Sequence, residues 1–170
     1  MLLVFDIDGT VSPIHPPKKL ASRYTMHSYL PVDERLIAAL DVLAGRPTVS
    51  VAWLTSWSSD SVAWLIDQLG GRLDGPYIPH TPDWATRAAG WRARSLLRYL
   101  EHASPDVLIW ADDDAGNDVN QRRLDRAGYR HRHLLFQPDK NVGLTLADVD
   151  QMNEFVQRFE DRLRLGSNQS

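Results

Sequence analysis

The stretch LLVFDIDGTV, residues 2–11, decides the fold. Its apolar run, Leu2–Phe5, is too short for a core helix and is typical of a buried strand. The Asp8-Gly9 pair is a turn signal, so the strand ends near Asp6. Asp6 and Asp8 therefore follow a strand end, and both can face the rim of a sheet. Ligands bind at that rim in open α/β sheets, which makes the two acids candidate functional carboxylates.

Further apolar runs along the chain alternate with helical patterns. The predicted strands cover residues 48–54, 107–111 and 133–136, with a short edge strand at 77–78, and the predicted helices cover residues 33–44, 58–69, 88–102, 119–127 and 145–163. Such alternation predicts βαβ units and a parallel sheet. We therefore expect a three-layer αβα, Rossmann-like α/β domain with about five parallel strands in flavodoxin-like order and Leu2–Phe5 in the centre.

Residues 12–31 separate the first strand from the first helix and contain four prolines, which disfavour a regular helix. This segment is predicted to be a long loop. Its basic residues Lys18, Lys19 and Arg23 either meet an anionic substrate or belong to a solvated loop. Neither this segment nor the one before the third helix is long enough to hold a large cap domain.

Composition limits the class of protein. The chain has 170 residues, 43% hydrophobic residues and a net charge of -3, and it has no cysteine. We expect one domain at residues 1–165, a disordered polar tail at 166–170, no disulfides and a cytoplasmic location. The start of the chain does not resemble a signal peptide, and no apolar stretch suits a membrane span. The net charge does not support nucleic-acid binding, although a local basic patch is left open.

Polar residues follow three of the predicted strands. Asp6 and Asp8 follow the first, Thr55 and Ser56 follow the strand at 48–54, and Asp112 and Asp113 follow the strand at 107–111. Alone, Thr55 suits a helix cap and the acidic run suits a solvated turn. Parallel strands, however, bring all these ends to one rim. Carboxylates gathered there repel each other and imply a bound cation, for which hard oxygen ligands favour Mg²⁺.

The string D-x-D-G-T-V after an apolar run resembles the first motif of the haloacid dehalogenase-like (HAD) phosphohydrolase superfamily. The resemblance implies that Asp6 is the nucleophile and Asp8 the general acid and base. Thr55 is similar to the second-motif residue and would hold a phosphate oxygen, with Ser56 beside it. The third motif requires a basic residue, for which Arg92 and Arg94 are the candidates; Arg92, nearer the helix start, is preferred.

The fourth motif supplies acidic metal ligands in the HAD superfamily. Asp112 and Asp113 match a strand followed by an acidic pair, whereas Asp114 and Asp118 resemble the D-x-x-N-D variant of the motif. We favour Asp112 and Asp113, because the strand ends at Ala111. The implied Mg²⁺ ligands are Asp6, Asp112 and the backbone carbonyl of Asp8, with Asp113 close by.

The resemblance implies a Mg²⁺-dependent phosphatase that acts through an aspartyl-phosphate on a phosphomonoester: a nucleotide, a polynucleotide end or a protein phosphate. The W-x-D-D string at 110–113 and the G-L-T string at 143–145 resemble small HAD-like domains linked with RNA-repair proteins. Trp57 either stacks on a base or packs against a helix. The alternative function is a catalytically idle HAD-like binding domain.

Overall fold

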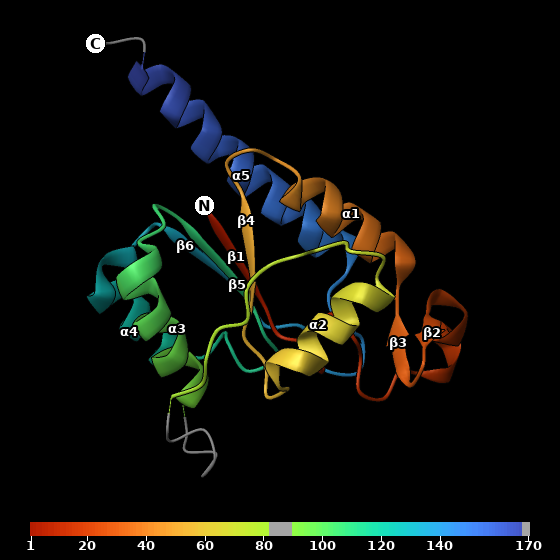
Figure 1. Ribbon diagram of the computed structural model, residues 1–170. Coiled ribbons are helices and arrows are strands. Elements are labelled where there is room, and N and C mark those ends of the chain that lie inside the picture. The colour runs from red at the N-terminus through yellow and green to blue at the C-terminus, as the bar shows by residue number, and fades with distance from the viewer. Residues whose placement is uncertain (82–89, 168–170) are drawn as a thin grey trace.

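The computed structural model describes residues 1–81 and 90–167. Its main sheet has four strands, all parallel, in the order β4-β1-β5-β6 (Figure 1): β1 (Leu2–Phe5), β4 (Ser50–Trp53), β5 (Leu108–Ala111) and β6 (His133–Phe136). The first strand lies between β4 and β5, which confirms its predicted central position. All four of its residues are buried, because helices cover both faces of the sheet.

The expected fifth strand is only a single bridge. Tyr77 pairs with Trp53 in parallel, and the Trp53 backbone N–H and C=O bond to Pro76 and Ile78 at 2.9 and 2.8 Å. In chain order, the Tyr77 segment follows β1 and β4. In space it lies outside β4, at the edge of the sheet. The flavodoxin-like order has only one strand beyond β1 on that side. The expected order is therefore wrong at this edge, and the sheet has four full strands.

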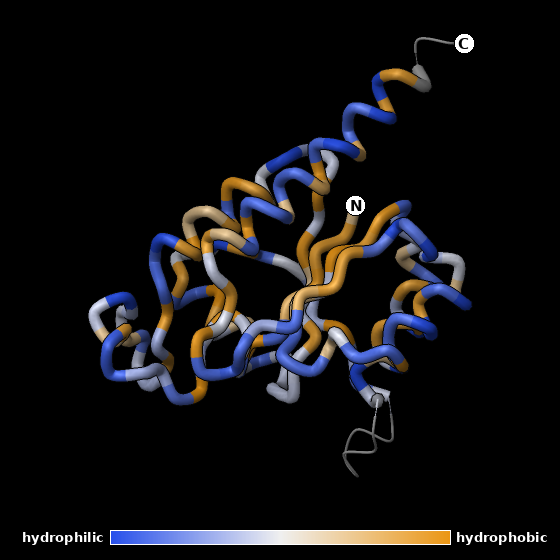
Figure 2. The backbone as a smooth tube through the Cα atoms, turned by 180° about the vertical axis from the view of Figure 1, so that it is seen from behind, coloured by the Kyte–Doolittle hydropathy of each residue, from blue (hydrophilic) through white to orange (hydrophobic). Residues whose placement is uncertain are grey.

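Helices pack on both faces of the sheet and make the predicted three layers. One face carries α1 (Glu34–Ala44), α2 (Ser59–Gln68) and α5 (Leu146–Ser167), and the other carries α3 (Trp91–Ala103) and α4 (Asp118–Leu124). Alternate residues of β1 point to opposite layers, so Leu3 and Phe5 join the first core and Leu2 and Val4 the second. Figure 2 shows the resulting hydrophobic strands between amphipathic helices.

The predicted loop at residues 12–31 has more structure than its prolines suggested. A 3-10 helix at Lys18–Arg23 begins directly after Pro17, and β2 (Thr25–His27) and β3 (Leu30–Val32) form an antiparallel hairpin. Proline is compatible with a helix start, and it is tolerated in a strand that pairs on one side. Arg23 bonds to the buried Asp33 at 2.5 Å, so its charge has a structural partner.

Other predicted boundaries shift by a few residues. The third helix begins at Trp91, whereas its predicted start at residue 88 lies outside the described residues. The fourth ends at Leu124 and continues as a π-helical turn, Asp125–Tyr129, with Gly128 at φ 89°. The last helix runs to Ser167, so the predicted tail at 166–170 starts too early, and residues 168–170 lie outside the described part.

The sheet is not covered by a large cap. In the described residues, the hairpin β2–β3 and its 3-10 helix are the only structure inserted between β1 and α1. None of the described helices has the length and apolar character needed to cross a membrane. In residues 1–81 and 90–167, the carboxyl ends of the strands carry loops and this small hairpin (Figure 1).

Candidate active site

The carboxyl ends of β1 and β5 place two acids side by side. Phe5 pairs with Ala111 in the parallel register, so the next residues, Asp6 and Asp112, leave the sheet as neighbours. The Asp6 N–H donates to the Ala111 carbonyl at 3.0 Å. The connections after β1 and β5 run to opposite sides of the sheet, toward β4 and β6. This is the switch point at which open α/β sheets bind ligands.

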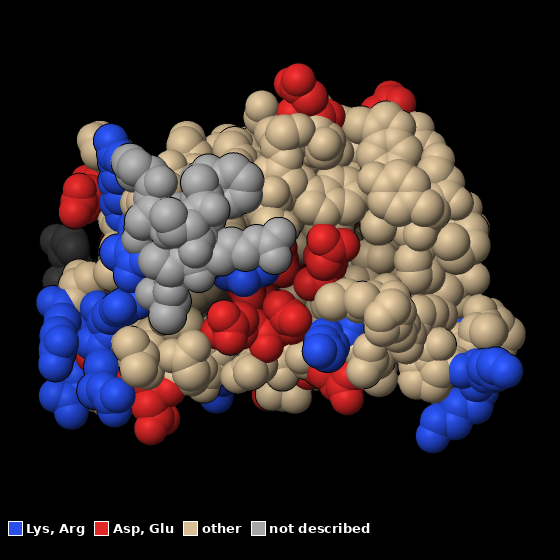
Figure 3. Space-filling view, turned by 90° about the horizontal axis from the view of Figure 1, so that it is seen from below, with Lys and Arg blue, Asp and Glu red and all other residues tan. Residues whose placement is uncertain are grey.

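Three carboxylates meet at this point. Asp6, Asp112 and Asp113 each offer one oxygen, and these oxygens lie within 4.8 Å of one another. Asp6 and Asp112 are fully buried, and Asp113 is half-buried. Figure 3 shows acidic side chains gathered near the middle of this face. The predicted first and fourth motif acids are therefore brought together.

Arg92 contacts two of these acids. It lies in the first turn of α3, and its guanidinium reaches Asp6 Oδ2 at 3.4 Å and Asp112 Oδ2 at 3.0 Å. The contact to Asp112 is an ion pair without hydrogen-bond geometry. Burial lowers the pKa of Arg92, but the charges of Asp112 and Asp6 outweigh it and hold that pKa above its usual range. The first turn of α3 thus supplies, through Arg92, a positive charge next to Asp6 and Asp112.

The acids are only partly compensated. Asp6 Oδ1 and Asp112 Oδ2 are buried without a hydrogen-bond partner. Burial raises the pKa of Asp6 to about 6, against the lowering effect of Arg92. Burial and the neighbouring Asp6 raise the pKa of Asp112 well above its usual range, and burial also raises the pKa of Asp113. Buried carboxylates without full hydrogen bonding, gathered within 4.8 Å, suit a hard divalent cation such as Mg²⁺.

Thr55 reaches the same site from β4. It is fully buried, and its side-chain hydrogen bond to Asp6 acts to lower the pKa of that acid. The cap of α2 is Ser58, whose side chain accepts from the Ser61 N–H at 3.2 Å, so Thr55 is not the helix cap. Ser56 is exposed beside it. Thr55 is therefore available to a ligand bound at Asp6.

Asp8 lies outside the cluster of three carboxylates and has a different partner. Its Oδ2 accepts a hydrogen bond from the indole Nε1–H of Trp57 at 2.8 Å. Trp57 is also packed against the core, which supports the helix-packing interpretation of this ring. The metal role expected for the Asp8 backbone carbonyl stays a prediction. The bond fixes the Asp8 carboxylate against the Trp57 indole.

A comparison with protein families decides the family. Residues 2–149 match the model described as the HAD domain in Swiss Army Knife RNA repair proteins. The chain belongs to this HAD family. No curated protein and no solved structure matches it. The resemblance inferred from the motifs is confirmed, and the family places the chain among HAD-type phosphohydrolases.

The structure also separates the two registers of the fourth HAD motif. Asp112 and Asp113 join Asp6, whereas Asp114 is exposed and the Asp118 side chain is 93% exposed. Asn117 caps α4 by accepting from the Asn120 N–H at 3.0 Å. The D-x-x-N-D string therefore starts a helix here. For the third motif, Arg92 contacts Asp6 and Asp112, and its role there stays a prediction.

Sequence reasoning missed two residues of the HAD site. Thr10 Oγ1 accepts from the Asp113 N–H at 3.1 Å, which ties the first motif to the fourth. Lys140, in the loop after β6, lies near Asp113 and acts to lower its pKa. A Cβ at Gly9 would come within 2.9 Å of Asp113 and 3.0 Å of Lys140, so only glycine fits this close approach. Thr10 stands in the quoted motif, but no local pattern points to Lys140.

Proposed function

We propose that this HAD domain is a Mg²⁺-dependent phosphatase that hydrolyses phosphomonoesters through an aspartyl-phosphate on Asp6. The observation that carries the proposal is the meeting of the Asp6, Asp112 and Asp113 carboxylates within 4.8 Å, with Arg92 against two of them. Family membership supports phosphohydrolase chemistry in general.

The proposed reaction has two steps, which use Asp6 and Asp8. In the first, a carboxylate oxygen of Asp6 attacks phosphorus while the ester bond breaks, and Asp8 gives a proton to the leaving oxygen. In the second, Asp8 takes a proton from water, the resulting oxygen attacks the phosphorus, and the bond to Asp6 breaks. Inorganic phosphate leaves, and Asp6 and Asp8 return to their starting states.

The surrounding groups stabilise phosphate at Asp6. Arg92, which pairs with Asp6, would neutralise negative charge, and the Thr55 hydroxyl, which bonds to Asp6, would bind a phosphate oxygen. The buried oxygens of Asp6 and Asp112 that lack partners would hold Mg²⁺, together with Asp113. When bound, Mg²⁺ supplies positive charge that keeps Asp6 ionised at neutral pH and offsets the charge of the phosphate.

Release of inorganic phosphate from an aryl phosphate tests the proposal. Wild type is expected to turn over with Mg²⁺ and to stop in EDTA. Asp6→Asn keeps the shape of the side chain but lacks the nucleophile, so the rate should fall at least about 1,000-fold. Asp118→Asn, at an exposed acid outside the cluster, is the matched control and should retain wild-type turnover.

Two outcomes would overturn parts of the proposal. If Asp6→Asn kept Mg²⁺-dependent turnover, the covalent step would be wrong. If wild type were inactive toward nucleotide, polynucleotide-end and protein phosphates alike, the domain would be the idle binding domain instead.

A further inference from the structure

Three aromatic rings gather beside the candidate active site. Tyr29, at the turn of the hairpin β2–β3, stacks on Trp64 with ring centroids 5.9 Å apart and planes 6° apart, and its ring lies 6.2 Å from that of Trp57. Trp57 precedes α2 and Trp64 lies within it, and both rings are half-buried. Tyr29 remains 67% exposed despite these contacts, so most of its surface is open to a ligand.

The hairpin holds Tyr29 in a defined position. Leu30 and Val32 are buried in the core, directly after the exposed tyrosine. On the other strand, His27 contacts Glu34 at 2.5 Å, and Glu34 also pairs with Arg72 at 2.8 Å. A ring fixed on both sides of its turn loses little freedom when a ligand stacks on it.

A hydrogen bond joins one of these rings, Trp57, to the candidate active site. The Trp57 Nε1–H donates to Asp8, the residue that protonates the leaving oxygen in the proposed mechanism. Trp57 therefore lies against the residue proposed to protonate the leaving group, and Tyr29 lies against the ring of Trp57. Figure 3 shows a broad uncharged surface on the side of α2 and the hairpin, next to the acidic centre.

We propose that Tyr29 is a stacking platform for the base of a nucleotide substrate, so that the leaving group is a nucleoside or the end of a nucleic-acid strand. This inference rests on the proposed phosphatase function. A nucleotide separates its base from its phosphate by a ribose, which matches a ring placed beyond Trp57. Stacking of this kind accepts every base, because each base has a π-face. A phosphotyrosine ring carries the leaving oxygen itself and would stop at Trp57, and phosphoserine has no ring.

Substrates with and without a base test the platform. We would measure kcat/KM for adenosine 5′-monophosphate, ribose 5-phosphate and a phosphotyrosine peptide with wild type and Tyr29→Ala. Loss of one stacked base should lower kcat/KM for the nucleotide about 5- to 100-fold relative to ribose 5-phosphate. Tyr29→Phe keeps the ring and should restore the preference. Met26→Ala, at an exposed residue of the same hairpin, is the matched control.

Each outcome decides the question. An unchanged ratio between the nucleotide and ribose 5-phosphate in Tyr29→Ala would overturn the platform while leaving the phosphatase intact. If kcat/KM for the phosphotyrosine peptide fell as much as that for the nucleotide in Tyr29→Ala, Tyr29 would not select a base. The assignment of a nucleotide substrate would then be overturned. If no substrate turns over, calorimetry of adenosine 5′-monophosphate with the Asp6→Asn protein decides. Weaker binding after adding Tyr29→Ala would support the platform, and equal binding would overturn it.

Discussion

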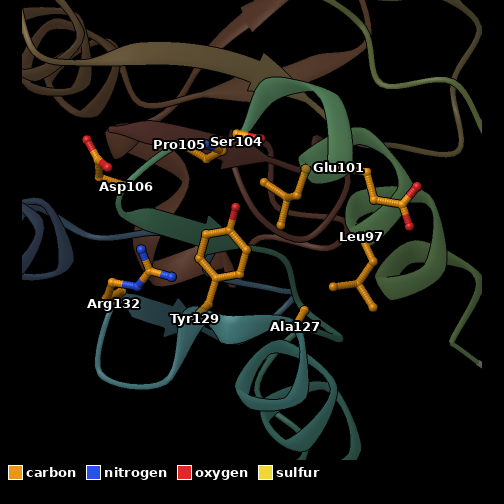
Figure 4. A pocket seen from close by; sticks show the side chains of 9 residues that line it. Leu97, Glu101, Ser104, Pro105, Asp106, Ala127, Tyr129 and Arg132 are labelled. Atoms are coloured by element: carbon orange, nitrogen blue, oxygen red, sulfur yellow. The ribbon is translucent and has the colours of Figure 1, made fainter.

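The two ends of the sheet differ in whether their charged side chains are buried. At the amino ends of β5 and β6, a cavity of about 450 Å³ lies between α3 and the turn at Asp125–Tyr129 (Figure 4). Its charges are solvated or paired: Glu101 and Asp106 are exposed, and Arg132 donates to the Gly128 carbonyl at 3.1 Å and covers the Tyr129 ring. Nothing there is both charged and buried.

The carboxyl ends carry buried charge beside a smaller cavity of about 290 Å³, which Arg92 helps to line. In the described part of the chain, four buried side-chain atoms lack a hydrogen-bond partner, and three of them belong to Asp6, Arg92 and Asp112. Burying charge without full compensation costs stability, so such a cluster is retained where a ligand or a reaction uses it. Buried charge that lacks full hydrogen bonding therefore distinguishes the candidate site better than the size of a cavity does.

Metal binding should show the largest difference between the two ends. Asp112→Asn removes one of the three converging carboxylates and should weaken Mg²⁺ binding by more than about 100-fold in calorimetry. Glu101→Gln removes an acid at the opposite cavity and should leave Mg²⁺ binding as in wild type. Equal losses in both variants would show that the two ends do not differ in this way.

The pH dependence of stability should reveal the buried acids in metal-free protein. The folded-state pKa of Asp6 is raised from 3.8 to about 6, so the folded chain binds more protons than the unfolded chain between these values. The free energy of unfolding should therefore rise as the pH falls from 7 to 4, by about 2 kcal/mol from this group. Denaturant unfolding in EDTA measures it.

Asp6→Asn is the control for this pH effect. It should be more stable than wild type at pH 7, and the difference should shrink as the pH falls through about 6. A constant difference between the two proteins from pH 7 to 4 would contradict the raised pKa of Asp6.

The smallest effect is expected from the indole bond to Asp8. Trp57→Phe keeps an aromatic ring but removes the Nε1–H donor, so Asp8 is held less firmly. Turnover of alkyl phosphates, whose leaving groups need protonation, should fall about tenfold. Aryl phosphates need less protonation and serve as the internal control. An equal loss on both kinds of substrate would assign Trp57 a packing role only.

Much of the fold could be predicted from local patterns. The apolar runs at β1, β4, β5 and β6 and the stripe of α1 are each visible within a few residues. Local patterns could not show that the segment at Tyr77 forms a single bridge to Trp53 and not a full strand. That outcome depends on how the segment lies against the sheet edge. The hairpin β2–β3 was missed because its prolines disfavour regular structure, while burial of Leu30 and Val32 stabilises it.

The site could be predicted only where its residues follow strand ends. Asp6, Thr55, Asp112 and Asp113 do so, and their convergence follows from the parallel sheet. The indole bond from Trp57 to Asp8 joins residues 49 positions apart, and Lys140 reaches Asp113 from the loop after β6. Such contacts depend on how loops fold over the sheet edge.

The sequence by itself determined the parallel α/β class, the central strand and the order of the four HAD motifs, because these depend on short-range hydrophobic patterns and on residues at strand ends. Only the tertiary structure showed that Asp112 and Asp113 lie beside Asp6, and that Arg92 contacts Asp6 and Asp112. The physical reason is that a carboxylate becomes part of the site through burial beside other charges. Neighbouring acids in one short run differ in burial only once the strand, the turn and the helix cap have been placed.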